Sequence, residues 1–260
     1  MDVINFILNW HLLPYPLGFS LMYFCYGVLT PYSYSTYWHC MCSHKYFTIA
    51  PWLQHIFRFQ LWLTTSIWYQ GHLTKFTAEH VLHHRYHDQM EGDPFNPRRY
   101  TLLELWTYEQ REGAARYVSP EDVEKYGDPS VEPNDPASMF YKRHQFKGWI
   151  LNSIIWGILM GPIGVVYGYL TQYAFQYIGT FMGDWLWHRF GYKPPNPECE
   201  ARNIFPWCIT TEGLHGNHHK NPHLANRRIR WFELDLFYWS HRLMAVFGWV
   251  KFNKQRALEK

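Results

Sequence analysis

Charged side chains are missing from two long stretches of this 260-residue chain. The first 44 residues contain a single charged residue, Asp2, and residues 149–183 contain none. An apolar helix of about 20 residues crosses the hydrocarbon layer of a bilayer. The mean hydropathy of -0.36 is that of a soluble protein, but the scale counts Trp and Tyr as polar, although both gather at membrane boundaries. Position along the chain therefore predicts membrane spans that the average hides.

Other absences narrow the class further. A content of 20% aromatic residues, without any solenoid-type repeat, excludes disorder, coiled coil and collagen. The five cysteines are odd in number and lie mostly in apolar or predicted cytoplasmic sequence, so no disulfide framework is expected. No basic segment precedes the first apolar stretch, so no secretory signal is expected. The net charge of +3 forms no patch that indicates nucleic acid.

Three segments have the length of a membrane span. We predict one span at about 16–38 and a hairpin of two spans at about 149–168 and 170–188, turning near Gly168. Pro162, after Gly161, removes a backbone donor and is expected to kink the first helix of the hairpin.

The segment 1–13 is too short for a comfortable span, and Pro14 and Pro16 interrupt the chain directly after it. This segment is expected to form an interfacial helix, a partial helix or half of a thin hairpin, and the sequence does not choose among the three. All 24 Lys and Arg residues lie in 45–147 and from 189 onward. Because Lys and Arg concentrate in cytoplasmic segments, both regions (45–147 and 189–260) are predicted to be cytoplasmic.

Two further helices are expected in the cytoplasmic sequence. Residues 52–73 are aromatic and apolar but contain Arg58, which favours an amphipathic helix lying in the plane of the bilayer. Ser119 followed by Pro120 and two acids predicts a helix start, and Gly127 its end. This helix lies in a hydrated connector, 108–143.

Histidine is the abundant residue, with 16 copies, and its spacing is specific. An H-x-x-x-x-H motif joins His39 to His44 at the end of the first predicted span, and His188 stands alone at the end of the hairpin. Two H-x-x-H-H motifs supply the remaining clustered histidines, which are His80, His83 and His84, and His215, His218 and His219.

The periodicity of the α-helix determines which of these histidines share a helix face. Positions i, i+3 and i+4 share a helix face, so each H-x-x-H-H motif is expected to present three imidazoles to one point. His39 and His44 are about 140° apart on an ideal α-helix. They share a face only if the helix ends, distorts or widens between them, and we predict such a break.

Nine clustered histidines exceed the ligands of one tetrahedral zinc ion. Imidazole suits Zn, Cu, Fe or Ni, so the ligand type alone does not name the metal. The count favours two iron ions in an oxygen-activating site. We therefore expect one all-α domain, 1–260: an integral, multi-pass membrane bundle of three to four spans with a cytoplasmic helical cap that holds a histidine-rich di-metal site.

The order of these motifs resembles the membrane fatty-acyl desaturases, most closely the stearoyl-CoA and bacterial delta-9 acyl desaturases. The likeness runs from about residue 16 to 250. Four local matches accompany the motifs: His84 to Pro94, Met139 to His144, His188 to Tyr192, and Glu212 to His215.

The resemblance implies that all nine histidines hold two iron ions. They are His39, His44, His80, His83, His84, His188, His215, His218 and His219. The family pattern differs at four positions, where this chain has Cys40, Val81, Gly216 and Asp184. Asp184 replaces an Asn that approaches one iron through water in the family, and an ionised Asp there is able to bind iron directly.

Acids and amides are candidates to orient the imidazoles from outside the ligand set. Glu212 and Asp184 are favoured, and the others are Asp93, Asn217, Glu79 and Asp235. Each is otherwise a helix cap or a solvated acid. Cys40 and Cys42 are expected to pack as small apolar residues.

Seven histidines remain. Six are expected at the boundary or the surface: His11, His55, His72, His144, His223 and His241. His87 is expected to lie outside the site, although it follows His83 and His84 by one turn.

The implied reaction removes two hydrogens from adjacent carbons of a long acyl chain, with O2 and two electrons, and leaves a double bond, delta-9 by resemblance. The acyl group is carried on a lipid, on CoA or on a carrier protein. No haem domain, flavin or nicotinamide fingerprint or iron–sulfur cysteine set is visible, so a separate electron donor of ferredoxin or cytochrome b type is expected. Arg227, Arg228 and Arg230 either dock that donor or follow the ordinary cytoplasmic and lipid-facing bias.

Two alternatives stay open. A hydroxylase or related oxygenase of the same superfamily would return oxygen to carbon and give an alcohol. A non-enzymatic membrane metal carrier would place histidines and acids within its spans. The clusters here lie at span ends and in cytoplasmic sequence, which argues against the carrier.

Overall fold

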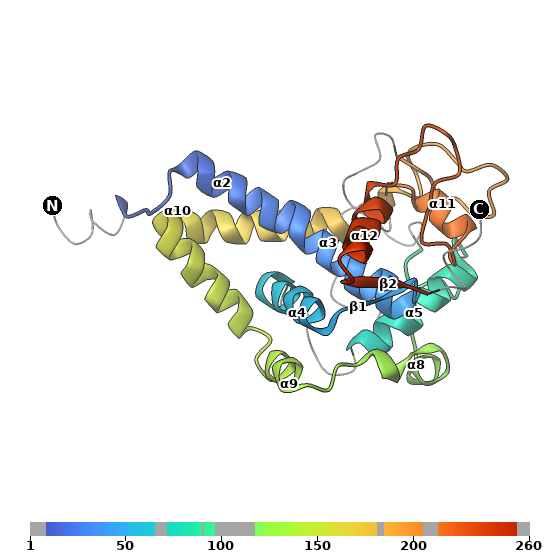
Figure 1. Cartoon of the computed structure of the whole chain (residues 1–260), viewed down its shortest axis with the longest axis horizontal. Helices are drawn as coiled ribbons and strands as arrows, with labels where there is room; N and C mark the ends of the chain where they lie inside the picture. The colour runs from blue at the N-terminus through green and yellow to red at the C-terminus, as the bar shows by residue number, and fades with distance from the viewer. Residues whose placement is uncertain are drawn as a thin grey trace.

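The computed structural model describes residues 9–65, 72–89, 91–96, 118–180, 185–204 and 213–253, with the side chains of 176–180 left out. The elements form two parts (Figure 1). A wedge of long helices, α2 and α10, occupies one end, and a cap of shorter helices with a two-stranded sheet occupies the other. The mostly helical fold agrees with the expected class, but the sheet was not predicted.

The first helical segment runs without a gap from residue 15 to residue 43. It comprises α2 (Tyr15–Tyr23), the π-helix η1 (Phe24–Leu29), α3 (Thr30–Tyr34) and a second π-helix, η2 (Ser35–Ser43). Pro31, the second residue of α3, lies inside this continuous run, directly after the π-helical turn of η1, and donates no backbone hydrogen bond there. This rod includes the predicted span 16–38 and ends in the first histidine motif.

The second long element is α10 (Lys147–Thr180), which is two helices joined at Gly161. Gly161 has φ 65° and ψ -157°, and Pro162 follows it. The arms fold back together, because Trp156 lies against Gly168 and Asn152 Nδ2 donates to Gln172 Oε1 at 3.4 Å. The chain therefore folds back as a helical hairpin, but the predicted turn near Gly168 is wrong. The turn is at Gly161 and Pro162, where only a kink was expected, because this glycine takes a positive φ and the proline has no N–H.

Glycines allow the rod and the two arms of α10 to pack closely against one another. A Cβ on Gly164 would lie 2.3 Å from the carbonyl oxygen of Trp156, and one on Gly18 would lie 2.3 Å from Sδ of Met160. Tyr26 accepts hydrogen bonds at its hydroxyl from Asn152 and Trp156. The rod and the first arm thus share one small core, which comprises Met22, Tyr26, Trp156 and Met160, and Phe175 of the second arm packs against it.

The tip of the wedge is tied to the start of the described chain. The backbone N–H groups of Leu12 and Leu13 both donate to the carbonyl of Leu159 at 2.9 Å. The indole of Trp10 donates to the carbonyl of Ile158 at 3.1 Å. These bonds satisfy carbonyls that the break at Gly161 leaves without helical partners.

Within the described residues, one helix, Gln145–Phe175, is long and apolar enough to cross a membrane. Its first arm, 147–160, rises about 21 Å at 1.5 Å per residue. That is less than the ~30 Å of a hydrocarbon core.

Short elements build the cap. The helices are α4 (Pro51–Thr65), α5 (His72–Tyr86), α8 (Pro120–Tyr126), η3 (Pro129–Val131), α9 (Pro136–Arg143), α11 (His215–Lys220) and α12 (Leu236–Val246). Strand β1 (Phe47–Ile49) pairs antiparallel with β2 (Val250–Phe252), with Thr48 opposite Lys251. The sheet ties the last described residues to the end of the first histidine motif, since Asn253 N also donates to the carbonyl of Tyr46.

Two sequence predictions in the cap are resolved. Helix α8 has Ser119 as N-cap, with a reciprocal capping box to Asp122, and ends at Gly127, as predicted. A helix forms at 51–65, but Arg58 is 4% exposed and pairs with Asp135 at 3.0 Å. Its outward face is apolar instead, with Trp52, Ile56 and Phe59 exposed.

Candidate metal centre

The first histidine motif depends on a π-helix. The N–H of His44 donates to the carbonyl of His39 at 3.0 Å, an i to i+5 bond. Such a turn takes in one more residue than an α-helical turn, so residues five apart stack on one face. The Nε2 atoms of His39 and His44 lie 3.1 Å apart. The predicted break is confirmed, and it is a widening of the helix.

Each H-x-x-H-H motif divides between two places. On α5, His80 and His84 face one way, with Nε2 atoms 3.1 Å apart, while His83 faces another. On α11, His215 and His219 pair at 3.0 Å, and His218 points elsewhere. The prediction of three imidazoles at one point is wrong, because i and i+4 are about 40° apart whereas i+3 lies about 60° to the other side.

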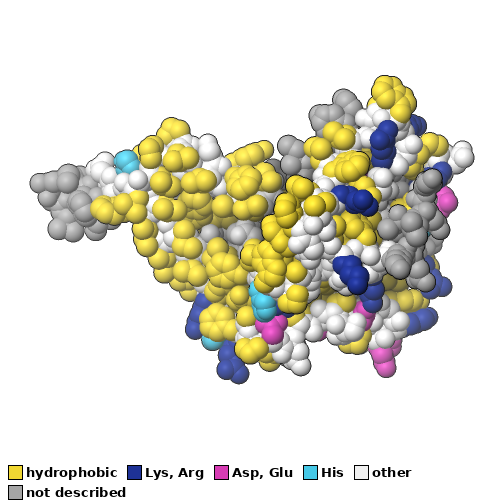
Figure 2. Space-filling model, in the orientation of Figure 1, with side chains coloured by type: hydrophobic (Ala, Val, Ile, Leu, Met, Phe, Trp, Pro, Cys, Tyr) yellow, Lys and Arg dark blue, Asp and Glu magenta, His cyan; other side chains and the backbone are white. Residues whose placement is uncertain are grey.

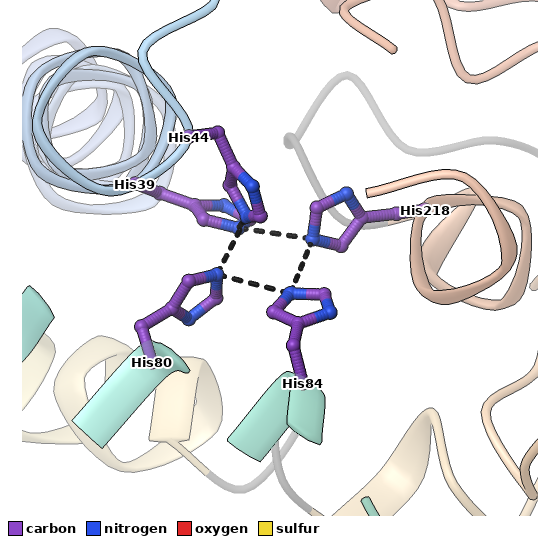
Figure 3. A group of neighbouring side chains, drawn as sticks. All are labelled: His39, His44, His80, His84 and His218. Carbon is purple, nitrogen blue, oxygen red and sulfur yellow. Dashed lines mark hydrogen bonds between the residues drawn. The ribbon is translucent and has the colours of Figure 1, made fainter. Parts of the chain in front are cut away.

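Five imidazoles form the first group (Figure 3): His39, His44, His80, His84 and His218. They come from η2 and the residue that caps it, from α5 and from α11, and their rings face a common centre. His39 Nε2 lies 3.2 Å from His218 Nε2, and His218 Nε2 lies 3.1 Å from His84 Nε2. His80 Nε2 closes the ring at 2.6 Å from His44 Nε2.

Four imidazoles form the second group: His83, His188, His215 and His219. His219 Nε2 lies 3.1 Å from His83 Nε2, and His188 Nε2 lies 3.2 Å from His215 Nε2. All four residues are buried. The groups adjoin, since the rings of His84 and His219 stack with centroids 4.6 Å apart. The structure thus brings all nine predicted histidines together, five and four.

Groups outside the cluster fix the orientation of three rings. Asp93, fully buried, accepts from His83 Nδ1 at 2.8 Å, as expected of an orienting acid. Asp88 accepts from His188 Nδ1 at 3.0 Å. The hydroxyl of Tyr46 donates to the carbonyl of Pro222 at 2.8 Å and lies 3.2 Å from His218 Nδ1.

Asp88 and Tyr46 are the contacts that sequence reasoning missed. Asp88 has a positive φ of 62° two residues after the end of α5, and its side chain also accepts from Glu200 N. Asp88 follows His84 by four residues and Tyr46 follows His44 by two, and this nearness to the motifs is the signal that could have suggested contacts with the site.

These bonds select one tautomer. A ring whose Nδ1–H donates to a carboxylate has a lone pair, and no hydrogen, at Nε2. Neutral nitrogens of this kind repel one another unless a cation lies between them. Adjacent ligands around an octahedral ion with bonds of about 2.1 Å lie about 3 Å apart. The separations of 2.6–3.2 Å in the first group fit that geometry, so the donor set suits a metal ion.

Burial favours the metal-binding form of the imidazoles. It lowers the pKa of His80, His84, His218 and His219 well below the usual value, and neighbouring imidazoles lower it further. Burial alone would raise the pKa of Asp88, but its hydrogen bonds from His188 and from the N–H of Glu200 lower it to about 2. Neutral histidines beside ionised carboxylates are ready to bind a cation without releasing protons.

The other predicted orienting residues have different roles. Asn217 bonds to Asn203, Glu233 and the carbonyl of Arg227, and so fastens α11 to the following loop. Asp235 caps α12, and Glu79 pairs with Lys75 at 3.4 Å. Asp184 and Glu212 lie outside the described residues.

The positions that depart from the family pattern are explained in part. Cys40 and Cys42 are buried, as predicted, in the main core, a cluster in the cap whose other members include Trp38, Phe57, Leu61, Trp62 and Phe237. The guanidinium of Arg227 lies 3.8 Å from Sγ of Cys40 and over the ring of Phe237. Arg227 is 3% exposed, so its assignment to a docking patch is wrong. A Cβ added at Gly216 would lie only 2.7 Å from the carbonyl oxygen of Ala201, so the side chain of an Asn has no room there.

The remaining histidines are mostly peripheral, as expected. His11, His55 and His223 are exposed, and His72 and His144 are half-buried. His241 was expected at the boundary but is 1% exposed, stacked on Phe47. His87 does not join either group, although its ring centroid lies 6.0 Å from that of His219.

The fold and the site define a class: a mostly helical protein whose histidine clusters are compatible with a di-metal site. No family model matches the chain. It is similar to the sn-2 palmitoyl-lipid 9-desaturase of Nostoc sp., 25% identical over 222 residues that cover 82% of this chain and 73% of that protein. It is also similar to the sn-1 stearoyl-lipid 9-desaturase of Synechocystis sp., 23% identical over 82% of this chain and 64% of the relative.

A third relative is named for a CoA-bound substrate. The icosanoyl-CoA 5-desaturase of Limnanthes douglasii is 24% identical over 89% of this chain and 63% of that protein. The chain thus spans between 63% and 73% of the length of these three relatives. The similarities confirm the predicted resemblance to the fatty-acyl desaturases and, with it, the expectation of an oxidoreductase.

Proposed function

We propose that the chain is a membrane fatty-acyl desaturase that uses two iron ions, O2 and two electrons to introduce a double bond, at delta-9, into a long acyl chain. The observation that carries the proposal is the convergence of nine imidazole Nε2 atoms in two adjoining groups. The relatives support acyl desaturation, and they include enzymes named for both lipid-bound and CoA-bound substrates.

The nine histidines are the proposed ligands. Iron bound by them would supply the oxidation, in which two C–H bonds of adjacent methylenes are replaced by a C=C bond while O2, two electrons and two protons become two waters. Asp93 and Asp88 keep the Nδ1–H of His83 and His188 engaged, so their Nε2 lone pairs stay directed inward. The protein's remaining task is to hold one methylene pair beside the metals, because orientation decides which bond reacts.

The wedge is proposed to lie in the bilayer and the cap on its cytoplasmic side. Helix α10 exposes at least half of the surface of Ile150, Ile154 and Ile158. Such an exposed apolar face is unfavourable in water but is favourable in contact with lipid. The basic residues lie in the cap and its connections. A multi-pass topology with the site on the cytoplasmic face follows, and a separate electron donor approaches from that side.

Expression in a host with saturated acyl chains tests the reaction. Fatty-acid analysis of total lipid, with a competent donor present, is expected to show a new unsaturated chain whichever carrier is used. His219→Ala removes a nitrogen from the second group and is expected to abolish the product and lower bound iron. His223→Ala, an exposed histidine outside both groups, is the matched control and is expected to match the unmodified chain.

The outcomes are distinct. A hydroxylated chain in place of the double bond would assign the oxygenase alternative. Iron loading without any change in lipid would reject the enzyme. A metal other than iron bound to the purified chain would reject the cofactor assignment.

A further inference from the structure

Helix α12 (Leu236–Val246) is apolar on two sides. One side faces the main core, where Phe237 and His241 are buried. At 100° per residue, the opposite side carries Leu236, Trp239, Leu243 and Val246 within an arc of about 80°. Trp239 is 55% exposed, Leu243 61% and Val246 80%. Nothing in the described part of the chain covers this second face.

Contacts of α12 fix its depth in the molecule. Ser240 Oγ lies 2.7 Å from the hydroxyl of Tyr32, and His241 Nε2 lies 3.1 Å from Thr36 Oγ1. Tyr32 and Thr36 are near the end of the predicted span 16–38. Figure 1 shows α12 crossing the axis of that rod where the wedge meets the cap. The helix is therefore held at the level where the rod leaves the apolar layer.

The exposed apolar surface continues beyond α12. Phe247 and Trp249 follow the helix, and the ring of Trp249 meets that of Trp52 on α4 at 5.3 Å. Trp52, Ile56 and Phe59 then extend it along α4. Figure 2 shows apolar side chains running from the wedge onto this part of the cap.

The chemistry of the edge suits lipid. Arg242 is exposed at the border of the apolar arc, where its guanidinium would meet phosphate headgroups. Tryptophan is the residue that gathers at headgroup level. We propose that α12 and the adjoining outward face of α4 form an interfacial anchor that lies in the plane of the bilayer, with Leu243 and Val246 inserted among the acyl chains.

The anchor rests on the membrane location within the proposed function but not on the chemistry of the metal centre. It would fix the cap, and so the histidine cage, at one height above the acyl chains. It would also add a second contact with the membrane, at residues far in sequence from the hairpin.

Depth-sensitive labelling of the full chain tests the anchor. A fluorophore is attached to Leu243→Cys, and the protein is reconstituted in vesicles of phosphatidylcholine and phosphatidylglycerol. Spin-labelled lipid is expected to quench this label several-fold more than a label at Glu124→Cys, an exposed site on α8. Iodide in the buffer is expected to give the reverse order. Both substituted positions are exposed, so the fold is not at risk.

A label at Ile154→Cys, an exposed position on α10, separates a failure of the anchor from a failure of the membrane placement. Quenching by lipid at Ile154 but not at Leu243 would overturn the anchor alone. Absence of lipid quenching at both would overturn the membrane placement itself. Shielding of Leu243 from both quenchers that disappears when the protein is diluted in lipid would assign the face to a second copy of the chain and overturn the anchor.

Discussion

The wedge and the cap treat polar groups in opposite ways. The cap encloses nine imidazoles and Asp93, and carboxylates accept hydrogen bonds from two of the rings, those of His83 and His188. The wedge buries only a few polar groups, such as Asn152 and Gln172, and exposes isoleucines along α10. Under the proposed function, metal ions bound inside the cap and lipid around the wedge would stabilise the two parts separately. Loss of metal and loss of lipid should affect different halves of the molecule.

Removing an orienting carboxylate is expected to have the largest effect. Asp93→Ala leaves His83 Nδ1 and the N–H groups of Asp88 and Phe95 without their acceptor. Loss of such a partner lowers metal affinity by about 10–100-fold. Metal content against increasing chelator measures this, with Asp93→Asn expected to be intermediate.

Asp122→Ala is the control, because that carboxylate caps α8 and touches no histidine. If Asp93→Ala keeps its metal as tightly as this control, the carboxylate does not orient the site. If it unfolds the wedge together with the cap, the two parts are not independent.

A glycine in the wedge comes next. Gly164→Ala forces a methyl group to within 2.3 Å of the backbone oxygen of Trp156, so the hairpin arms must separate. Overpacking of this kind costs about 1–3 kcal/mol, or a few degrees in Tm. Thermal unfolding in detergent or nanodiscs measures the loss, and metal content of the folded protein should not change.

Gly157→Ala is the matched variant, because its Cβ would meet only a side-chain methyl of Val165 at 3.2 Å. Its Tm should stay within about 2 °C of the parent. Equal destabilisation by both substitutions would mean that close approach of the arms does not hold the wedge.

The smallest effect is expected at two arginines of the cap, Arg228, which is exposed, and Arg230, which is half-buried. Arg228→Glu with Arg230→Glu should slow electron delivery several-fold at low salt and less at high salt, because charge acts mainly on encounter. Turnover with the native donor against ionic strength checks this, at constant iron content. Turnover that matches the parent at every salt concentration would leave these residues without a role in docking. Arg227 is left unchanged because it is buried.

The sequence predicted the members of the site better than its layout. Motif spacing selected eight of the nine histidines, whereas His188 stands alone and was added by the family resemblance. The spacing also predicted a distortion between His39 and His44, which the π-helix supplies. It failed on Asp88 and Tyr46, because the histidines that they contact, His188 and His218, are 100 and 172 residues away along the chain.

Errors in the wedge have a local cause. Both Gly161 and Gly168 were available for a turn, and only the former precedes a proline and takes a positive φ. In the cap, His241 and Arg227 resemble surface residues in sequence because they are polar, yet both pack against the main core.

The sequence by itself determined that apolar segments alternate with histidine-bearing segments, since charge and helical spacing are local properties. Only the tertiary structure decided that the histidines divide five and four, that Asp88 and Asp93 lie behind two of them, and that α12 keeps one face uncovered. These features depend on how η2, α5, α11 and α12 cross. Their crossings are set by contacts between residues more than 100 positions apart, such as Tyr32 with Ser240 and His83 with His219.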